Sequence, residues 1–540
     1  DELGARGESV EMVMGDTARC PWDMGTFGSM TTRFFGPALR AAGAEARGVL
    51  MELAAEHLNV PKDKLATSDG TIFVKGQKQK KVSYGELARG KTIERHLDPK
   101  PETKDVSEFQ IMGKPYRRID SEEKVSGKAR YAGDIRLDGM LYARILRPPA
   151  HGATLTSVDT SAAEEVEGAQ VVRDGNLIAV LHKTPDGAER GLSKIKADWD
   201  VPEAVADDET IFEYLMEKPP RPNVAERAGN LDEGRKRADH ILEETYYNSY
   251  VAHAPIETHT ALAHVEGDKI TVWASTQGPF RVQPEVANGL GVPEDNVRVI
   301  TPFVGGGFGG KTSAPQAVEA ARLSRITGKP VQVAWSRAEE FFLDTFRPAS
   351  IIKIKSGITN DGKIVFWDNA VYYAGSRGSD LYYAVPHHRT TIYGEWRGGR
   401  LAHPFSVGPW RAPANNSNTH ARECQIDVMA AKAGIDPIEF RIKNLEDKRM
   451  IRVPETAAEK FGWKPAAALS GRGVGVACGI DAGTYVATIA EVAVDKLTGR
   501  IDVKRVVCAQ EMGIVINPAG ATIQMEGCIT MGLGYTLGEE

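Results

Sequence analysis

The glycine-rich segment GGGFGGKT, residues 305–312, constrains this chain more than any other feature of its sequence. Glycines tolerate positive φ angles and let backbone N–H groups approach an anion or a flat cofactor closely. The strand-like VRVITPFV precedes the segment, and the helix-like APQAVEAARLSRITGK follows it. A helix N-terminus behind such a loop favours a negatively charged group. The segment therefore predicts a cofactor-binding turn between a strand and a helix, without specifying the cofactor.

Two nucleotide-binding patterns fit this segment. Residues 305–310 satisfy GxGxxG and residues 305–312 satisfy GxxxxGKT, so a P-loop NTPase is one alternative and a plain tight turn is another. Against nucleotide binding, no convincing apolar strand ending in a Mg²⁺-binding Asp follows within about a hundred residues. The aromatic ring of Phe308 is unnecessary for gripping phosphate, which favours a position on a cofactor or beside a substrate. Packing of Phe308 in the core explains that residue equally well.

Composition excludes several classes of protein. The chain has 540 residues, of which 41% are hydrophobic and 26% charged, which predicts about two to four globular domains. Lys plus Arg total 67 against 73 Asp plus Glu, so a nucleic-acid binder that relies on bulk positive charge is not expected. No apolar run reaches the roughly 18 to 20 residues of a membrane span.

The five cysteines are scattered, and none forms a CxxC pair. They predict neither a disulfide scaffold nor a structural zinc or iron-sulfur site in this chain. The first residues lack a methionine and resemble a helix running into a strand, VEMVM, instead of a leader peptide. We expect the numbering to begin inside a longer polypeptide, and the last residues, MGLGYTLGEE, stop equally abruptly.

The pattern of strands, helices and loops predicts five regions. A Gly- and Ser-containing loop, residues 25–32, leads into a long Ala- and Leu-rich helix over residues 37–58. A polar, Lys-rich stretch with short strand candidates such as TIFV then indicates a connector with little core, and a Pro- and acid-rich stretch within 200–230 indicates a linker. The expected regions are 1–58, 59–112 (connector), 113–203 (compact α+β), 238–450 (larger α/β) and 465–540 (strands and turns).

Several strings occur in the order that is typical of one family. They lie at residues 113–144, 253–263 (HAPIETHTALA), 273–277 (WASTQ), 297–311, 411–445 and 516–534. In this order they resemble the large subunit of molybdenum hydroxylases, of the xanthine oxidase and aldehyde oxidase type. The resemblance covers most of the chain and largely removes the P-loop interpretation. It implies an α+β, multidomain molybdopterin-binding large subunit, with an α/β hammerhead domain at 113–203, molybdopterin-binding domain 1 at 238–450, and the start of domain 2 at 465–540.

The resemblance also implies site residues. Gln277 is similar to the glutamine that hydrogen-bonds an oxo ligand of molybdenum, and Phe308 and Gly309 resemble the loop on the opposite side of the metal. Gly307 would allow close access to the pterin. Arg411 resembles the arginine near the substrate pocket, although a surface ion pair is an equally simple interpretation. Gln277, Phe308 and Arg411 are the expected catalytic residues, and no protein side chain is expected to ligate the metal.

Departures from the family pattern limit the expected substrates. Lys311 is expected to be a structural neighbour of the cofactor. Thr312 stands where xanthine-specific members resemble one another in having a carboxylate, which puts a purine substrate in doubt. Pro413 replaces an aromatic residue common in this loop, and the loop lacks the cysteine of carbon monoxide dehydrogenases.

The N-terminal loop resembles the family's pterin-phosphate loop and would place Gly28, Ser29 and Thr31 on the cofactor, whereas helix capping would use one of them. Its position ahead of residue 113 resembles the permuted order of the isoquinoline 1-oxidoreductase β-subunit group. Gln524 matches a further cofactor-binding glutamine. The family's MGQG segment is absent, and its general base, a glutamate in GxGE, is expected beyond residue 540. Glu539 and Glu540 match a non-catalytic part of the pattern.

The resemblance implies hydroxylation of an aldehyde or N-heteroaromatic carbon with oxygen from water. The cofactor would be Mo-molybdopterin, in bacteria usually as the cytosine dinucleotide form. Electrons would pass to a [2Fe-2S] small subunit and, in the resembling group, often to a c-type cytochrome. Relatives of the permuted type often carry a twin-arginine leader, which favours the periplasm over the cytoplasm. The remaining alternative is a non-catalytic, cofactor-carrying module, because the general base is missing from these residues.

Overall fold

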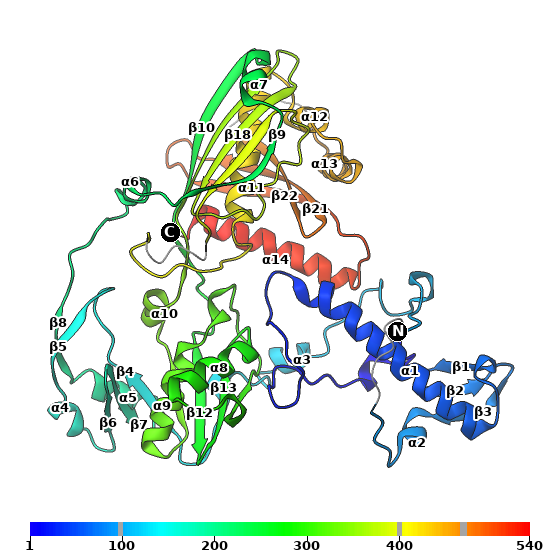
Figure 1. The fold of residues 1–540 in the computed structure, drawn as a ribbon, viewed down its shortest axis with the longest axis vertical. Helices are drawn as coiled ribbons and strands as arrows, with labels where there is room; N and C mark the ends of the chain where they lie inside the picture. The colour runs from blue at the N-terminus through cyan, green and yellow to red at the C-terminus, as the bar shows by residue number, and fades with distance from the viewer. Residues whose placement is uncertain (95–100, 397–401, 465–471, 540) are drawn as a thin grey trace.

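The structure is a computed structural model that describes residues 1–94, 101–396, 402–464 and 472–539. Figure 1 shows a large sheet with its helices at the lower left, a second sheet at the top, and the long helix α1 with a small sheet at the lower right. The described part therefore has several separate cores, as its length predicts.

A seven-stranded mixed sheet carries the glycine-rich segment. Its strand order is β14-β13-β12-β15-β4-β7-β6. One hydrophobic core extends along the sheet and under helices α8 (Pro279–Leu290) and α9 (Pro315–Thr327). The strands are β4 (Leu141–Ile145), β6 (Gln170–Asp174), β7 (Leu177–His182), β12 (Thr260–Glu266), β13 (Lys269–Ala274), β14 (Val297–Ile300) and β15 (Val331–Ala334).

Residues 113–203 form a separate two-stranded sheet, β5-β8, but their strands β4, β6 and β7 continue the sheet of 260–334. The parallel pairing of Val331 with Leu141 joins the two regions. The expected compact domain over 113–203 therefore shares its core with the larger region that follows. Its other elements are α3 (Ser121–Val125), β5 (Thr154–Asp159), α4 (Ser161–Glu164), α5 (Pro185–Leu192) and β8 (Lys196–Asp200).

A five-stranded sheet, in the order β10-β17-β18-β19-β9, forms the second core. Helix α11 (Asn415–Ala433) packs on β17 and β10, and a three-stranded sheet, β20-β21-β22, adds buried side chains from its own strands. The predicted linker is partly wrong, because β9 lies within it and pairs with β19 as the edge strand of this sheet.

The elements of this region lie in the upper part of Figure 1. They are α6 (Ile211–Glu217), β9 (Pro222–Ala228), α7 (Leu231–Arg237), β10 (His240–Asn248), β17 (Ser350–Ile358), β18 (Ile364–Tyr372), β19 (His388–Tyr393), α12 (Pro437–Lys443), α13 (Lys448–Phe461), β20 (Arg472–Asp481), β21 (Thr484–Val494) and β22 (Ile501–Glu511). The short strands β11 (Val251–Ala252) and β16 (Phe346–Arg347) pair with each other, and helix α10 (Arg337–Leu343) precedes β16.

The N-terminal region confirms one prediction and corrects two. The helix predicted over 37–58 is α1 (Gly36–Leu58), with a proline in its first turn. The connector predicted over 59–112 contains the strand candidate TIFV as β2 (Thr71–Val74), but with β1 (Leu65–Ser68), β3 (Gln77–Ser83) and α2 (Tyr84–Ala88) it forms a small core against α1. The strand-like VEMVM forms no strand, and its apolar side chains are exposed because no neighbouring strand covers them.

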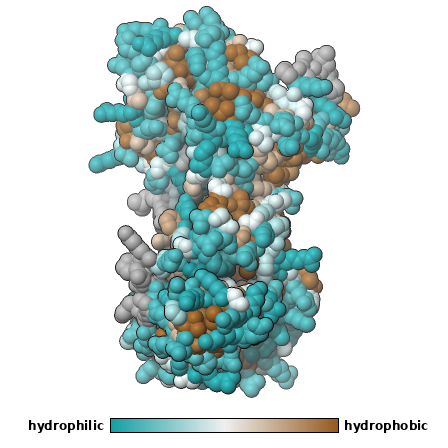
Figure 2. Space-filling model, turned by 90° about the vertical axis from the view of Figure 1, so that its right-hand side faces the viewer, coloured by the Kyte–Doolittle hydropathy of each residue, from teal (hydrophilic) through white to brown (hydrophobic). Residues whose placement is uncertain are grey.

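The two residues before helix α14 (Pro518–Leu537) hydrogen-bond to the start of region 113–203. The amide of Gly113 donates to Ile516 O at 2.9 Å, and that of Tyr116 donates to Asn517 Oδ1 at 3.1 Å. Figure 2 shows a mostly hydrophilic surface with separate hydrophobic patches on the face that it presents. None of the helices in the described ranges is both long and apolar enough for a membrane span. The boundaries of the five expected regions remain predictions.

Candidate functional site

The glycine loop, residues 305–310, connects β14 to α9 as predicted. At Gly309 the φ angle is +117°, and a Cβ atom there would lie 1.9 Å from Pro409 O. Only glycine fits this contact, which presses the loop against the segment before Arg411. Among the described residues, the backbone N–H groups of Gly306, Gly307 and Phe308 have no hydrogen-bond partner. These successive donors can serve a bound group.

Gln277 joins the glycine loop to the N-terminal loop. It lies between β13 and α8, and its Oε1 accepts from the amide of Gly309 at 3.0 Å. Its Nε2 donates to Thr26 O at 2.8 Å, and its own carbonyl accepts from the amide of Thr26 at 2.7 Å. A Cβ on Gly307 would lie 2.4 Å from Oε1. The carboxamide is therefore fixed, and one of its two N–H bonds remains for another acceptor.

Phe308 and Arg411 lie against each other. Phe308 has a positive φ of 55°, and its carbonyl accepts from the amide of Arg411 at 3.0 Å. The Arg411 guanidinium carbon lies 5.0 Å from the Phe308 ring centroid and 4.8 Å from that of Trp410. The Arg411 Nη1 pairs with Glu539 at 3.2 Å, whereas its buried Nε has no partner among the described residues.

The backbone around Arg411 is strained. Arg411, Ala412 and Ala414 have φ angles of 23°, 57° and 63°. Positive φ angles at residues other than glycine store strain and occur preferentially at functional sites. This strain is an independent indication that the segment has a functional role.

Lys311 does not face a phosphate position. It binds Glu257, a partner that the sequence analysis did not predict. The side chain is fully buried, and Nζ donates to Glu257 O at 2.6 Å and to Glu257 Oε2 at 3.1 Å. Burial lowers the pKa of Lys311, and the charge of Glu257 opposes that shift. The same Oε2 accepts from Ser275 Oγ and from the amide of Gly305, both at 2.7 Å. Lys311 is thus a structural residue under the loop.

A second buried network lies under the loop and was also missed. His253 Nδ1 lies 2.8 Å from Asp344 Oδ2, and its Nε2 lies 2.7 Å from Pro409 O. Both ring nitrogens therefore lie within hydrogen-bond distance of an oxygen atom. Burial opposes ionisation of Asp344, but the hydrogen bond from His253 holds the pKa of that carboxyl below its usual value. The network fixes the position of the segment before Arg411.

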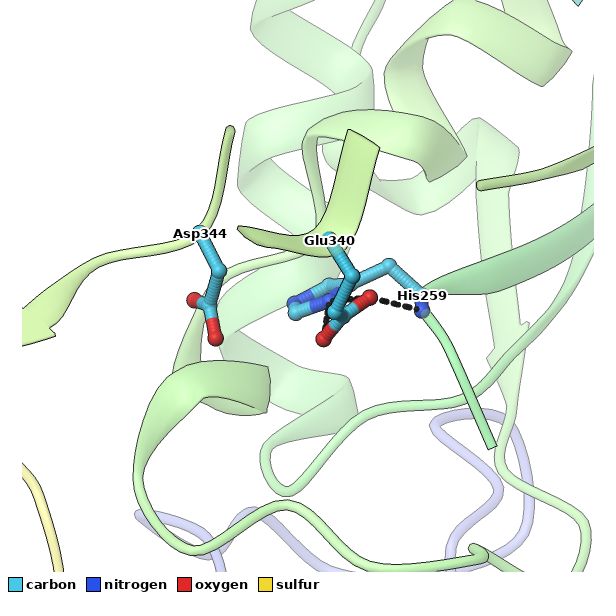
Figure 3. Close-up of side chains that lie close together, drawn as sticks. All are labelled: His259, Glu340 and Asp344. Carbon is cyan, nitrogen blue, oxygen red and sulfur yellow. Dashed lines mark hydrogen bonds and ion pairs between the residues drawn. The ribbon is translucent and has the colours of Figure 1, made fainter. Parts of the chain in front are cut away.

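Figure 3 shows the neighbouring side chains His259, Glu340 and Asp344. Their potential ligand atoms lie within 4.8 Å of one another, which is the spacing of a metal site. The Nδ1 atom of His259 already lies 3.0 Å from Glu340 Oε1, and Glu340 Oε2 accepts from the amide of His259. Because His259 and Glu340 already hydrogen-bond to each other, the cluster is a hydrogen-bonded support for β12 and α10.

The other expected cofactor residues lie in two places. Gly28 and Ser29 have positive φ angles and follow Thr26, the residue of the N-terminal loop that contacts Gln277. Thr31 is the first residue of the turn before α1. Within the described part of the chain, the hydroxyls of Ser29 and Thr31 make no hydrogen bond, so they can bind a ligand. Gln524 is exposed on α14, roughly 20 Å along the helix from Glu539. The structure shows no contact of Gln524 with the glycine loop.

Models of a molybdopterin cofactor-binding domain match residues 216–445 and, in two segments, residues 1–131 and 438–540. Together they cover more than half of the chain. The chain is 28% identical, over its whole length, to a nicotinate dehydrogenase subunit of Pseudomonas putida. Over 95% of its length it is 27% identical to the beta subunit of isoquinoline 1-oxidoreductase of Brevundimonas diminuta. The chain belongs to the molybdenum hydroxylase family.

This molybdenum hydroxylase chain spans 49% of the length of the nicotinate dehydrogenase subunit and 74% of the isoquinoline oxidoreductase subunit. The aldehyde oxidoreductase of Desulfovibrio gigas matches with a TM-score of 0.69 and 16% identity, over 79% of this chain and 71% of that chain. These matches confirm the expected α+β fold and molybdopterin-binding type. The P-loop alternative finds no support, in agreement with the burial of Lys311.

The residues present fit a molybdopterin cofactor. Three adjacent N–H groups of the glycine loop lack partners within the described ranges, and the hydroxyls of Ser29 and Thr31 are exposed ahead of a long helix. A Cβ on Gly28 would meet nothing closer than 3.6 Å, so its need for glycine comes from its φ of 61° and not from crowding. The glycine loop therefore offers the donors that a pterin uses, and the N-terminal loop offers those that suit a phosphate.

Proposed function

We propose that this chain, in its intact complex, hydroxylates an aldehyde or N-heteroaromatic carbon with oxygen from water. One observation carries the proposal. The glycine loop with its Phe308, Gln277 and Arg411 come from three separate parts of the chain and meet at backbone donors that have no partner among the described residues. The names of the similar proteins, which include a nicotinate dehydrogenase and an isoquinoline oxidoreductase, support the class of substrate.

The chain contributes positioning and charge. We assign to the remaining N–H of Gln277 a hydrogen bond to an oxygen of the cofactor, and to Phe308 the role of limiting access to it. Arg411 places a positive charge beside Phe308, where it can orient an electron-rich atom of the substrate. When bound, the cofactor supplies two-electron redox chemistry and a metal that acidifies water.

Electrons must leave after each turnover, and we propose that a separate [2Fe-2S] subunit accepts them first. The five cysteines of the chain are free in the structure and form no cluster-binding set in the described ranges. We further propose the cytosine dinucleotide form of the cofactor, a c-type cytochrome as a later acceptor, and a periplasmic location. Gln524 is proposed as a cofactor contact.

The test is elemental and nucleotide analysis of the purified intact complex. Near-stoichiometric molybdenum, iron from a partner and cytosine nucleotide released by acid are expected, followed by oxidation of aldehydes or azaarenes. A complex that lacks molybdenum, or that holds molybdenum but oxidises neither class of compound when sulfide-activated, would refute the proposal.

A further inference from the structure

The last turn of α14 packs on the segment that carries Arg411. The Tyr535 ring meets the Trp410 ring edge-on, and their centroids are 5.1 Å apart. Just after the helix, the amide of Glu539 donates to Gly534 O at 3.0 Å. These contacts fix the end of α14 and bring the Glu539 side chain to the candidate site, where the family pattern gives it no catalytic role.

The Glu539 carboxylate faces the Arg411 guanidinium. Its Oε1 and Oε2 atoms accept from Arg411 Nη1 at 3.2 and 3.3 Å. Gly534 leaves the space for this carboxylate, because a Cβ atom there would lie 2.6 Å from Oε1. Within the described ranges, no second carboxylate pairs with Arg411. Because the Arg411 side chain is mostly buried, its attraction to Glu539 is screened less than that of a surface pair.

The ion pair leaves a hydrogen-bond donor at the site. Arg411 Nη2 carries two N–H bonds, and one of them donates to His253 O at 3.2 Å. The other has no acceptor in the part of the chain that the structure describes. The carbon of this guanidinium lies 5.0 Å from the centroid of the Phe308 ring. The site therefore offers an N–H donor whose positive charge is already offset, which suits an uncharged acceptor such as a carbonyl oxygen or a ring nitrogen.

Glu539 also offsets a second cation. The guanidinium carbons of Arg347 and Arg411 lie 4.9 and 4.8 Å from the centroid of the same Trp410 ring. Burial lowers the pKa of Arg347 to about 10. The charges of Tyr535 and Glu539 oppose this pKa shift, and the charge of Arg411 adds to it. Without the Glu539 charge, two neighbouring guanidinium groups would attract anions to the site.

We propose that Glu539 determines the charge specificity of the site, because its carboxylate makes the site select uncharged molecules over carboxylates. A carboxylate at the free N–H of Arg411 would lie beside the Glu539 carboxylate, and such like-charge contacts are unfavourable. Glu539 acts through Arg411, so it is a specificity-determining residue and not a catalytic one. As a statement about substrates, the inference rests on the proposed function and narrows its substrates to uncharged aldehydes and azaarenes.

The test is isothermal titration calorimetry of the intact complex with benzamide and with benzoate, which share a ring and differ in charge. The parent is expected to bind benzamide roughly tenfold more tightly than benzoate. Glu539→Gln keeps the shape of the side chain but removes its charge, so benzoate affinity should rise about tenfold while benzamide affinity changes less than about twofold. High salt should reduce the gain for benzoate and leave benzamide unaffected, a readout that a purely structural role of Glu539 would not change.

Two further variants control the measurement. Glu539→Asp retains the charge and should keep the preference for benzamide. Glu511→Gln is the matched control, since Glu511 has a similar exposure and also pairs with an arginine, Arg449, that stacks on an aromatic ring, Tyr485, outside the candidate site. It should leave both affinities unchanged.

Equal affinities in the parent, tighter binding of benzoate, or binding of neither compound would each overturn the proposal without requiring any variant to fold. A folded Glu539→Gln complex with the same ratio of affinities as Glu511→Gln would overturn it as well. Turnover is measured separately, with benzaldehyde and 4-formylbenzoate among the substrates. If the proposed function fails, no aldehyde or azaarene is oxidised but the binding ratios remain, whereas if the inference fails, turnover remains but the parent shows no preference for the uncharged compound.

Discussion

Replacing Lys311 with methionine tests the interpretation of the glycine-rich segment as a supported loop. The substitution keeps most of the side-chain volume and leaves the Glu257 carboxylate buried without its cation. Breaking a buried ion pair in this way costs about 3–5 kcal/mol. Ser275 Oγ and the amide of Gly305 still donate to Oε2 at 2.7 Å, so we expect the lower limit, about 3 kcal/mol of unfolding free energy.

Urea unfolding of the purified chain measures this loss. Lys329→Met, at an exposed lysine after α9, is the control and should change stability by less than about 0.5 kcal/mol. The double variant Lys311→Met/Glu257→Gln removes both charges and should recover roughly 1–2 kcal/mol relative to additivity. A Lys311→Met protein as stable as the Lys329→Met control, or a strictly additive double variant, would refute the reasoning.

Three further outcomes are expected. Burial lowers the pKa of His403 to about 4, so the folded protein holds the neutral ring. The contribution of this neutral ring to the free energy of unfolding is fully present above about pH 6.5, and it falls by roughly 2 kcal/mol from pH 7 to pH 5. Urea unfolding at the two pH values should show this loss in the parent but not in a stable His403→Gln variant. Gly309→Ala should lower the thermal midpoint and the molybdenum content together, since its Cβ collides with Pro409 O; a variant that binds cofactor normally contradicts this contact. Gln277→Ala removes the side-chain hydrogen bond to Thr26 and leaves the backbone one, so limited chymotrypsin digestion at Phe27 should be about tenfold faster than in Gln283→Ala, and equal rates would show that the carboxamide does not hold the loop.

Local signals were predicted well from the sequence. Residues next to one another in the chain specify the strand, glycine loop and helix around residues 305–312, and also the helix at 37–58. Both helices, for example, have a proline in the first turn. The meeting of Gln277, Phe308 and Arg411 followed from the family resemblance, because no local pattern specifies a contact between positions so distant in the chain.

The errors have physical causes. Strand β3, QKQKKVS, exposes its first five residues, so its lysines indicate a solvated sheet face instead of a connector. VEMVM has strand propensity but no partner strand, and propensity without a neighbour does not make a strand. The pairing of Lys311 with Glu257 depends on burial, which the chemistry of single residues does not predict.

The shared seven-stranded sheet has a consequence for synthesis of the protein. Strand β4 lies between β7 and β15, and the side chain of Arg144 bonds the carbonyl of Ala334, 190 residues later. At about 5–20 residues per second, a ribosome needs roughly 10–40 s to deliver that partner after β4 has emerged. Once β7 has also emerged, and for the rest of this interval, the hairpin of β4 and β7 presents an unpaired edge that can associate with other chains. Chaperone binding to the nascent chain should therefore peak between the emergence of residue 182 and that of residue 334.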